Sequence, residues 1–370
     1  MSTNFDSFYE KLNSEYENIK STIKKPNILI IGATGVGKSS LINSVFGKDL
    51  VKVGTGEPVT KEITTYTSEK VPIVLYDTKG YEIGTKEQDK FLNDVLSYTI
   101  NSNSKNTDEK IHMVWYCIQA SGHRILDVDT MVLNQLHAAG IPVAVILTKC
   151  DLVTQEEVDK LKDILSKDAK TVRAFLITTE DIPEIGTLEL NDLIKWSLDM
   201  LPEGLKLAFL SAQKINLEEK KKAAKSAIIK HTSGAGLIGM TPIPFADAPL
   251  LLTNQAGMFA RIMFIYDMAD MLKQVQALIG SFGIGSLIST SGIWLVGQIM
   301  KIVPILGTLT GAVVSGTVAS AITAAIGFSI SEVCYKMSLY VLDGDTEGLK
   351  TFINGLGKYF QELVKNSFKK

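Results

Sequence analysis

The stretch from Asn27 to Asn43, NILIIGATGVGKSSLIN, sets the strongest limit on how this chain can fold. It begins with a short apolar run, continues through three closely spaced glycines and ends in a helical pattern. The spacing of those glycines and of the Lys38-Ser39 pair is typical of a loop whose backbone N–H groups surround a polyphosphate. A strand at Ile28–Ile31 and a helix from about Lys38 would direct a positive helix end at the same anion. The alternative is a bare glycine turn before a helix, and the two flanks argue against it.

Each residue of this loop has an expected task. Lys38 would reach the β- and γ-phosphates, and the Ser39 hydroxyl would ligate Mg²⁺, which is the expected cofactor. The other loop residues would contact the phosphates through their backbone: Thr34, Gly35, Val36, Gly37 and Ser40.

A second segment ends a predicted strand with a carboxylate. The apolar run Ile73–Tyr76 leads into Asp77-Thr-Lys-Gly80. Asp77 can hold a metal-bound water, and the Gly80 N–H can meet a γ-phosphate. Because the strands of an open α/β sheet bind their ligand at their carboxyl ends, this segment is expected beside the glycine-rich loop.

A third segment follows the apolar run Val143–Leu147 and is suited to reading a base. It consists of Thr148-Lys149-Cys150-Asp151. A carboxylate at Asp151 can accept hydrogen bonds from guanine N1–H and N2–H₂, and adenine lacks that pair of donors. Thr148 and Lys149 are expected to complete the contact.

Taken together, these motifs resemble those of the Era-like and septin-like small GTPases of the TRAFAC class. The resemblance rests on GATGVGKSSLINSVFG, GEPVTKEITTY, DTKG and TKCD, which occur in that order. It implies an α/β P-loop GTPase domain, with a mostly parallel sheet flanked by helices, that binds GTP or GDP.

The resemblance also implies roles for individual residues. Thr60 would join Ser39 as a ligand of Mg²⁺ in the triphosphate state only. Lys38, Thr60 and Gly80 would be the catalytic residues. The loop at Thr178 and Thr179 would contact the edge of the base.

Hydrolysis is expected to be slow without help. Tyr81 follows the DTKG motif, where many relatives have a glutamine that orients the attacking water. No arginine lies between Ser40 and Asp77, so the first switch contains no arginine finger. Arg124 is a candidate finger supplied by a second protomer, which would form a homodimer across the nucleotide site. A surface salt bridge is the alternative role for Arg124.

Composition divides the chain into three expected parts: an amphipathic helix at 1–25, a GTP-binding domain at 26–203, and an all-helical, glycine-rich apolar domain at 204–370. The first helix would dock on its own protein, with a partner or membrane as the alternative. The third part would open with one lysine-rich helix at 205–230. The resemblance here is to a helical domain of unknown function that follows the GTPase domain in some bacterial proteins.

Two long uncharged runs form an apolar hairpin at about 274–331. Both runs exceed the roughly 20 residues of a membrane span, yet both are diluted by glycine, serine and threonine. One interpretation is a hairpin packed in its own bundle that can contact or enter a bilayer. The other is a permanent two-span anchor.

Charge and cysteine content narrow the other options. The net charge of −2 argues against a nucleic-acid-binding protein, because such proteins are usually strongly basic. The part from residue 204 onward has 16 Lys/Arg against 10 Asp/Glu, which is compatible with an anionic membrane surface. Three scattered cysteines suggest neither a disulfide framework nor a metal site. The expected location is the cytoplasm, or the inner face of the plasma membrane as a peripheral or integral protein.

The sequence therefore predicts a GTP-binding and GTP-hydrolysing switch that couples nucleotide state to a helical, membrane-associated domain. Two alternatives remain open. One is a GTP-gated scaffold with little turnover, and the other is a membrane-acting effector that GTP triggers.

Overall fold

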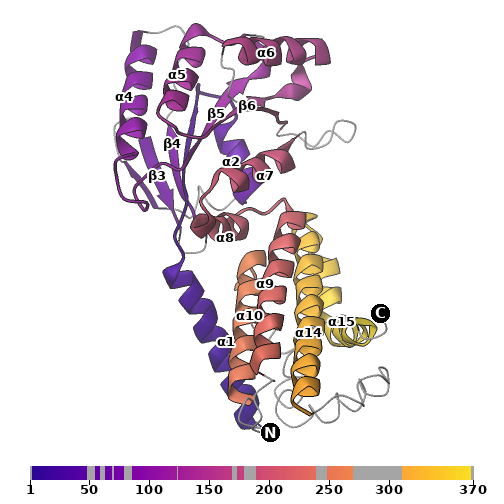
Figure 1. The fold of residues 1–370 in the computed structure, drawn as a ribbon. Helices are drawn as coiled ribbons and strands as arrows, with labels where there is room; N and C mark the ends of the chain where they lie inside the picture. The colour runs from indigo at the N-terminus through magenta and orange to yellow at the C-terminus, as the bar shows by residue number, and fades with distance from the viewer. Residues whose placement is uncertain are drawn as a thin grey trace. The chain divides into compact units, whose positions relative to one another are not determined.

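The computed structural model describes residues 2–47, 55–58, 63–68, 71–78, 86–122, 124–168, 173–178, 189–238, 248–269 and 311–367. Contacts divide the chain into two compact units. Figure 1 colours the chain by residue number, from indigo at the N-terminus to yellow at the C-terminus. The sheet unit comprises Ile23–Asn216, and the helical unit comprises Met1–Thr22 together with Leu217–Lys370.

A mostly parallel sheet forms the centre of the sheet unit (Figure 1). Within the described residues its strands are β1 (Asn27–Gly32), β2 (Thr55–Pro58), β3 (Ile63–Thr67), β4 (Val74–Thr78), β5 (Met113–Gln119), β6 (Val143–Thr148) and β7 (Arg173–Leu176). Their order is β2-β3-β4-β1-β5-β6-β7. The strands from β4 to β7 in that order are parallel, and β2 and β3 add an antiparallel edge. The expected α/β architecture is confirmed.

Helices cover both faces of this sheet because successive residues of each strand point to opposite sides. The helices are α2 (Lys38–Phe46), α4 (Lys86–Ser102), α5 (Asp127–Ala138), α6 (Gln155–Asp168), α7 (Leu190–Met200) and α8 (Glu203–Ala212), with short 3₁₀ turns η1 (Ala120–Gly122) and η2 (Cys150–Leu152). On one face, Leu29 and Ile31 of β1 pack with buried residues of α4, α5 and α6.

On the other face, an aromatic cluster holds α2 and α8 against β5. The rings of Phe46 and Trp115 stack with centroids 5.7 Å apart, and Phe209 of α8 meets both edge-on, at 6.1 and 6.5 Å. Since Phe209 is fully buried in this cluster, α8 belongs to the sheet unit. The contact boundary after Asn216 therefore differs from the one expected at residues 203–204.

The lysine-rich stretch that the sequence suggested as one helix forms two. Helix α8 ends at Ala212 and α9 (Leu217–Ile238) begins after a short turn. In that turn Gln213 Nε2 donates to the carbonyl oxygen of Asn216 at 3.0 Å, and the Asn216 N–H donates to Gln213 Oε1 at 2.8 Å. These side-chain bonds satisfy backbone groups that a continuous helix would have paired internally.

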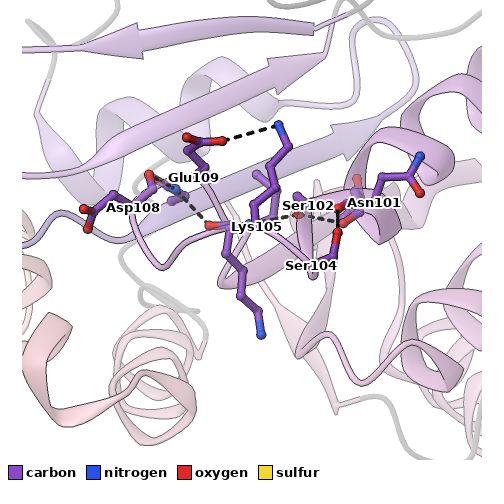
Figure 2. Close-up of polar contacts among 10 residues, drawn as sticks. Asn101, Ser102, Ser104, Lys105, Asp108 and Glu109 are labelled. Atoms are coloured by element: carbon purple, nitrogen blue, oxygen red, sulfur yellow. Dashed lines mark hydrogen bonds and ion pairs between the residues drawn. The ribbon is translucent and has the colours of Figure 1, made fainter.

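Within the connection from α4 to β5, Lys105 forms an ion pair with Glu109 and the Ser104 hydroxyl donates to the carbonyl oxygen of Asn101 (Figure 2). Further hydrogen bonds fix this connection to the start of β1. The Asn27 side-chain amide donates to the carbonyl oxygens of Asp108 and Lys110, at 2.9 and 2.8 Å. The Asn27 N–H donates to His112 Nδ1 at 2.9 Å. These bonds define where β1 begins, and β1 leads directly into the glycine-rich loop.

The described helices of the helical unit are α1 (Ser2–Thr22), α9, α10 (Ala248–Tyr266), α14 (Gly311–Leu342) and α15 (Thr346–Ser367). Helix α1 packs along α10 (Figure 1), with the rings of Phe8 and Phe259 5.6 Å apart and those of Tyr16 and Phe264 5.9 Å apart. The amphipathic first helix therefore docks on its own protein.

The expected apolar hairpin is only partly described. Its residues 274–310 lie outside the described residues, and its remainder begins α14. In the parts of the chain that the structure describes, no helix combines the length and the apolar character that a bilayer crossing requires.

Candidate nucleotide-binding site

The loop between β1 and α2 is shaped by its glycines. Gly37 has φ +103°, a backbone conformation that disfavours other residues, and it immediately precedes α2. At Gly32 an added Cβ would lie 2.6 Å from the carbonyl oxygen of Cys117 on the neighbouring strand β5. Glycine at these two positions therefore allows the turn and the close approach of the two strands.

Lys38 folds back over this loop. Its Nζ donates to the carbonyl oxygens of Gly32 at 3.0 Å and Ala33 at 3.1 Å, and the residue is buried. Burial lowers the pKa of Lys38, while the negative charge of Asp77 opposes that shift. The loop thus contains a cation with little water around it, which favours an anionic ligand.

Asp77 lies on β4 beside this cation, paired in register with Ile30 of β1. Burial raises the pKa of Asp77 to about 6, and Lys38 acts in the opposite direction. Among the described residues, nothing donates a hydrogen bond to the buried Asp77 Oδ1. Ser39, in the first turn of α2, is exposed and offers a second oxygen donor. A carboxylate oxygen left without a partner and an exposed hydroxyl fit the oxygen ligands that Mg²⁺ prefers.

Thr148 connects the end of β6 to the loop. Its Oγ1 donates to the carbonyl oxygen of Val36 at 2.6 Å, and the carbonyl oxygen of Ile118 lies 3.3 Å away. Lys149 follows with φ +56°, and its Nζ donates to Gln119 Oε1 at 3.1 Å. Asp151 is half-buried in η2. This segment therefore contacts the glycine-rich loop between β1 and α2 through Thr148.

A family model described as 50S ribosome-binding GTPase matches residues 27–149. That range contains the glycine-rich loop, Asp77, Thr148 and Lys149. Residues 27–149 match this GTPase family, and the unit that contains them has the P-loop GTPase fold.

Individual relatives match this GTPase domain at modest identity. The probable GTP-binding protein EngB of Aquifex aeolicus is 28% identical over 138 residues, which cover 36% of this chain and 72% of EngB. Septin CDC11 of Candida albicans is 24% identical over 192 residues, which cover 42% of this chain and 48% of the septin. The solved structure of Arabidopsis thaliana Toc33 with Mg²⁺ and GMPPNP is 18% identical, covers 54% of this chain and 96% of that chain, and has a TM-score of 0.35.

A cavity of about 190 Å³ in the GTPase domain lies next to the P-loop. Ala33, Thr34 and Val36 line one side of it, and residues from the end of β5 and the connection to α5 line the other: Cys117, Ile118, Gln119, Gly122, Arg124, Leu126 and Asp129. Arg124 is exposed and takes part in this lining. The structure thus brings Arg124 to the P-loop of its own chain.

Sequence reasoning missed Gln119, which joins the Lys149 side chain to the end of β5. A usable signal was its position, since Gln119 ends a parallel strand at the edge where Asp77 and Thr148 lie. Thr178 is buried after β7, where the Ile177 N–H donates to the carbonyl oxygen of Leu147 at 2.8 Å. Thr60, Gly80, Tyr81 and Thr179 lie outside the described residues.

Proposed function

We propose that this protein is a switch that binds and hydrolyses GTP with Mg²⁺ as its cofactor. The observation that carries the proposal is the convergence of three groups on the P-loop: the Lys38 ammonium, the Asp77 carboxylate and the Thr148 hydroxyl. A simple structural turn needs neither a buried cation nor a buried carboxylate oxygen without a partner.

The phosphates would lie against the backbone of residues 34–40, and Lys38 would exchange its carbonyl partners for phosphate oxygens. Ser39 and Asp77 would hold Mg²⁺, with Thr60 joining them in the triphosphate state. When bound, the ion would neutralise charge on the β- and γ-phosphates.

Asp151 would select guanine, while Lys149, Thr178 and Thr179 would contact the edges of the base. Thr148 supports this contact indirectly, because its hydroxyl is bonded to the P-loop carbonyl of Val36. Guanine recognition by Asp151 is what separates this proposal from a general phosphate-binding site.

The test is Asp151→Asn in the full chain, with GTP, ATP and xanthosine triphosphate binding measured by calorimetry in the presence of Mg²⁺. We expect GTP to lose, and the xanthine nucleotide to gain, at least about tenfold in affinity, which corresponds to about 1.4 kcal/mol. Asp163→Asn on the exposed side of α6 is the matched control. An unchanged base preference in the Asp151 variant would contradict the proposal.

Hydrolysis would depend on charge neutralisation by Lys38, the Gly80 N–H at the γ-phosphate, and a water held in line for attack. Tyr81 replaces the usual water-orienting glutamine, so turnover by one protomer would be slow. A second protomer could complete the site and form a homodimer across the nucleotide. Arg124, which is exposed and lines the P-loop cavity of its own chain, would then have to reach the nucleotide of the other protomer.

The helical unit would change its contacts according to the bound nucleotide, either with the inner face of the plasma membrane or with a partner protein. A GTP-gated scaffold with little turnover is the second candidate, favoured by Tyr81 and by the lack of arginine between Ser40 and Asp77. Phosphate release followed over hours, with and without liposomes, separates the two. Release that stays at background under both conditions would favour the scaffold.

A further inference from the structure

The helical unit contains a second cavity that the nucleotide site does not use. It is a groove of about 470 Å³ between α9, α14 and α15. Lys221, Lys222 and Lys225 of α9 line one side, together with Glu218. The other side combines two apolar side chains, Phe328 of α14 and Leu363 of α15, with the polar residues Ser329, Ser331, Glu332 and Ser367. Cations therefore face two apolar side chains and several polar ones across a volume in the range of small-molecule sites, roughly 300–1,000 Å³.

Two of the three lysines already have partners. Lys221 forms a 3.6 Å ion pair with Glu332, and its Nζ lies 4.5 Å from the centroid of the Tyr335 ring. Lys222 forms a 2.6 Å ion pair with Glu219. The groove's carboxylates are engaged as well, since Glu218 accepts a hydrogen bond from the Tyr335 hydroxyl at 3.0 Å.

Lys225 differs from these two lysines. It is exposed, and the described residues include no carboxylate paired with it. A free ammonium at the edge of a groove is a ready site for one negative charge, and its four-carbon stem can lie along apolar surface.

Two large apolar side chains at or near the groove, Phe328 and Ile229, are exposed to solvent. Phe328 is 42% exposed, although it belongs to a helix whose neighbouring residues are largely buried. Ile229 is 52% exposed and lies four residues after Lys225, on the same face of α9. The lysines and the exposed apolar residues thus form one amphipathic surface.

We propose that this groove binds an acidic membrane lipid, with its anionic headgroup at Lys225 and its acyl chain along Phe328 and Leu363. The size of the groove favours a lipid over an acidic peptide helix. A helix is about 10 Å wide, so it would fill the groove with roughly one turn. A single acyl chain is narrower than a helix and can lie against Phe328 and Leu363.

This inference deepens the proposed membrane coupling of the helical unit and rests on it. It places the contact on α9, α14 and α15 and does not require the undescribed residues 270–310. Lipid binding is measured without nucleotide, so its failure would leave the proposed GTP binding unaffected.

The experiment is flotation of the full chain with vesicles of phosphatidylcholine alone, or of phosphatidylcholine mixed with phosphatidylglycerol. We expect binding to the acidic vesicles only, weakened at high salt because the attraction is electrostatic. Lys225→Gln should weaken it about fivefold, the usual effect of one lysine at an acidic surface. Phe328→Ser should weaken it at least as much.

Lys230→Gln is the matched control, because Lys230 is an exposed lysine on the same helix that does not line the groove. It should bind like the unchanged protein. An unchanged urea midpoint for loss of helical circular dichroism in the Lys225 variant would show that the fold is intact.

Three outcomes would overturn the proposal. Equal binding to neutral and acidic vesicles, or equal loss in the Lys225 and Lys230 variants, would remove the role of this cation. Sedimentation without vesicles that Phe328→Ser abolishes would make a second copy of the chain the occupant. Uptake of a soluble fatty acid or an acidic peptide by protein that ignores acidic vesicles would exclude the bilayer.

Discussion

The hydroxyl of Thr148 donates a 2.6 Å hydrogen bond to the carbonyl oxygen of Val36, and both residues are buried. The bond joins the end of β6 to the P-loop across 112 positions of sequence. The two segments expected to contact the base and the phosphates are therefore mechanically connected. Thr148 therefore holds the backbone of the P-loop at Val36.

Thr148→Val should weaken both the fold and nucleotide binding. Valine keeps the shape of threonine but leaves the buried Val36 carbonyl oxygen without this donor, which costs about 1–3 kcal/mol. We expect a loss of that size in the free energy of urea unfolding and weaker GTP binding by calorimetry. Thr148→Ser keeps the hydroxyl and should retain most of both. A valine variant as stable as the unchanged protein would show that the bond is not needed.

Asp77→Asn should weaken the dependence of GTP binding on Mg²⁺. Residues that hold a metal-bound water typically contribute about 10–100-fold in metal affinity, and asparagine removes the charge without changing the shape. Mg²⁺ titrations of the GTP complex measure this. Asp94→Asn on the exposed side of α4 is the control.

The same substitution should stabilise the metal-free protein at neutral pH. The pKa of Asp77 is raised from 3.8 to about 6 in the fold, so above pH 6 the folded chain carries a carboxylate that it disfavours. Removing the charge eliminates that cost. A variant that loses both Mg²⁺ affinity and metal-free stability would contradict our interpretation of Asp77.

Arg124→Ala should abolish activation of hydrolysis by a second protomer. We expect turnover per protomer to rise with protein concentration in the unchanged chain and to stay flat in the variant. An arginine finger contributes about 10³–10⁵ in rate, so the difference should be easy to measure by phosphate release. Arg173→Ala is the control, because Arg173 is exposed on β7 and lies over the Phe175 ring. Turnover that does not depend on concentration in the unchanged chain would exclude this role.

His112 should make the fold less stable as the pH falls. Burial, with a smaller contribution from Lys110, lowers the pKa of His112 from 6.5, and its Nδ1 accepts the Asn27 N–H only while the ring is neutral. In the unfolded chain the His112 ring takes up a proton as the pH falls through 6.5, whereas in the folded chain it does so only at a lower pH. The free energy of unfolding therefore decreases below pH 6.5.

His112→Asn offers the Asn27 N–H an acceptor that does not titrate. Its loss of unfolding free energy between about pH 7.5 and 5.5 should be smaller by about 1 kcal/mol than that of the unchanged protein. Urea unfolding at both pH values measures this. His137→Asn, at an exposed position on α5, is the control.

Phe209→Ala should destabilise the sheet unit although it lies beyond the expected end of the GTPase domain. The ring packs edge-on against both Phe46 and Trp115, and removing a buried phenylalanine costs about 3–5 kcal/mol. The urea midpoint for loss of GTP binding measures the effect. Met200→Ala, at an exposed methionine, should change the free energy of unfolding by less than about 0.5 kcal/mol and leave the midpoint almost unchanged. Equal midpoints for the two variants would place α8 outside the unit.

The P-loop and the parallel strands were predictable because their signals are local. Four apolar residues before Gly32 and the Lys38-Ser39 pair after Gly37 suffice for a strand, a tight turn and a helix. The strand ends that carry Asp77 and Thr148 follow from the same reasoning, and the structure has both residues at the ends of β4 and β6.

Other features depend on contacts between distant residues. Strand β2 is the polar sequence TGEP, and it forms an edge strand through its pairing with β3. The end of α8 contains neither glycine nor proline, and side-chain bonds between Gln213 and Asn216 make the turn. The place of Arg124 beside Thr34 likewise depends on how β5 and β1 lie together.

The packing of α1 on α10 means that the sheet unit interrupts the sequence of the helical unit, with covalent links at both of its ends. A protease cut at Ile23–Pro26 would separate the chain into two peptides without separating the molecule. The Phe8–Phe259 and Tyr16–Phe264 contacts would keep the short peptide in place. Nicked protein would run as two bands in denaturing gels and still elute from a sizing column as one species.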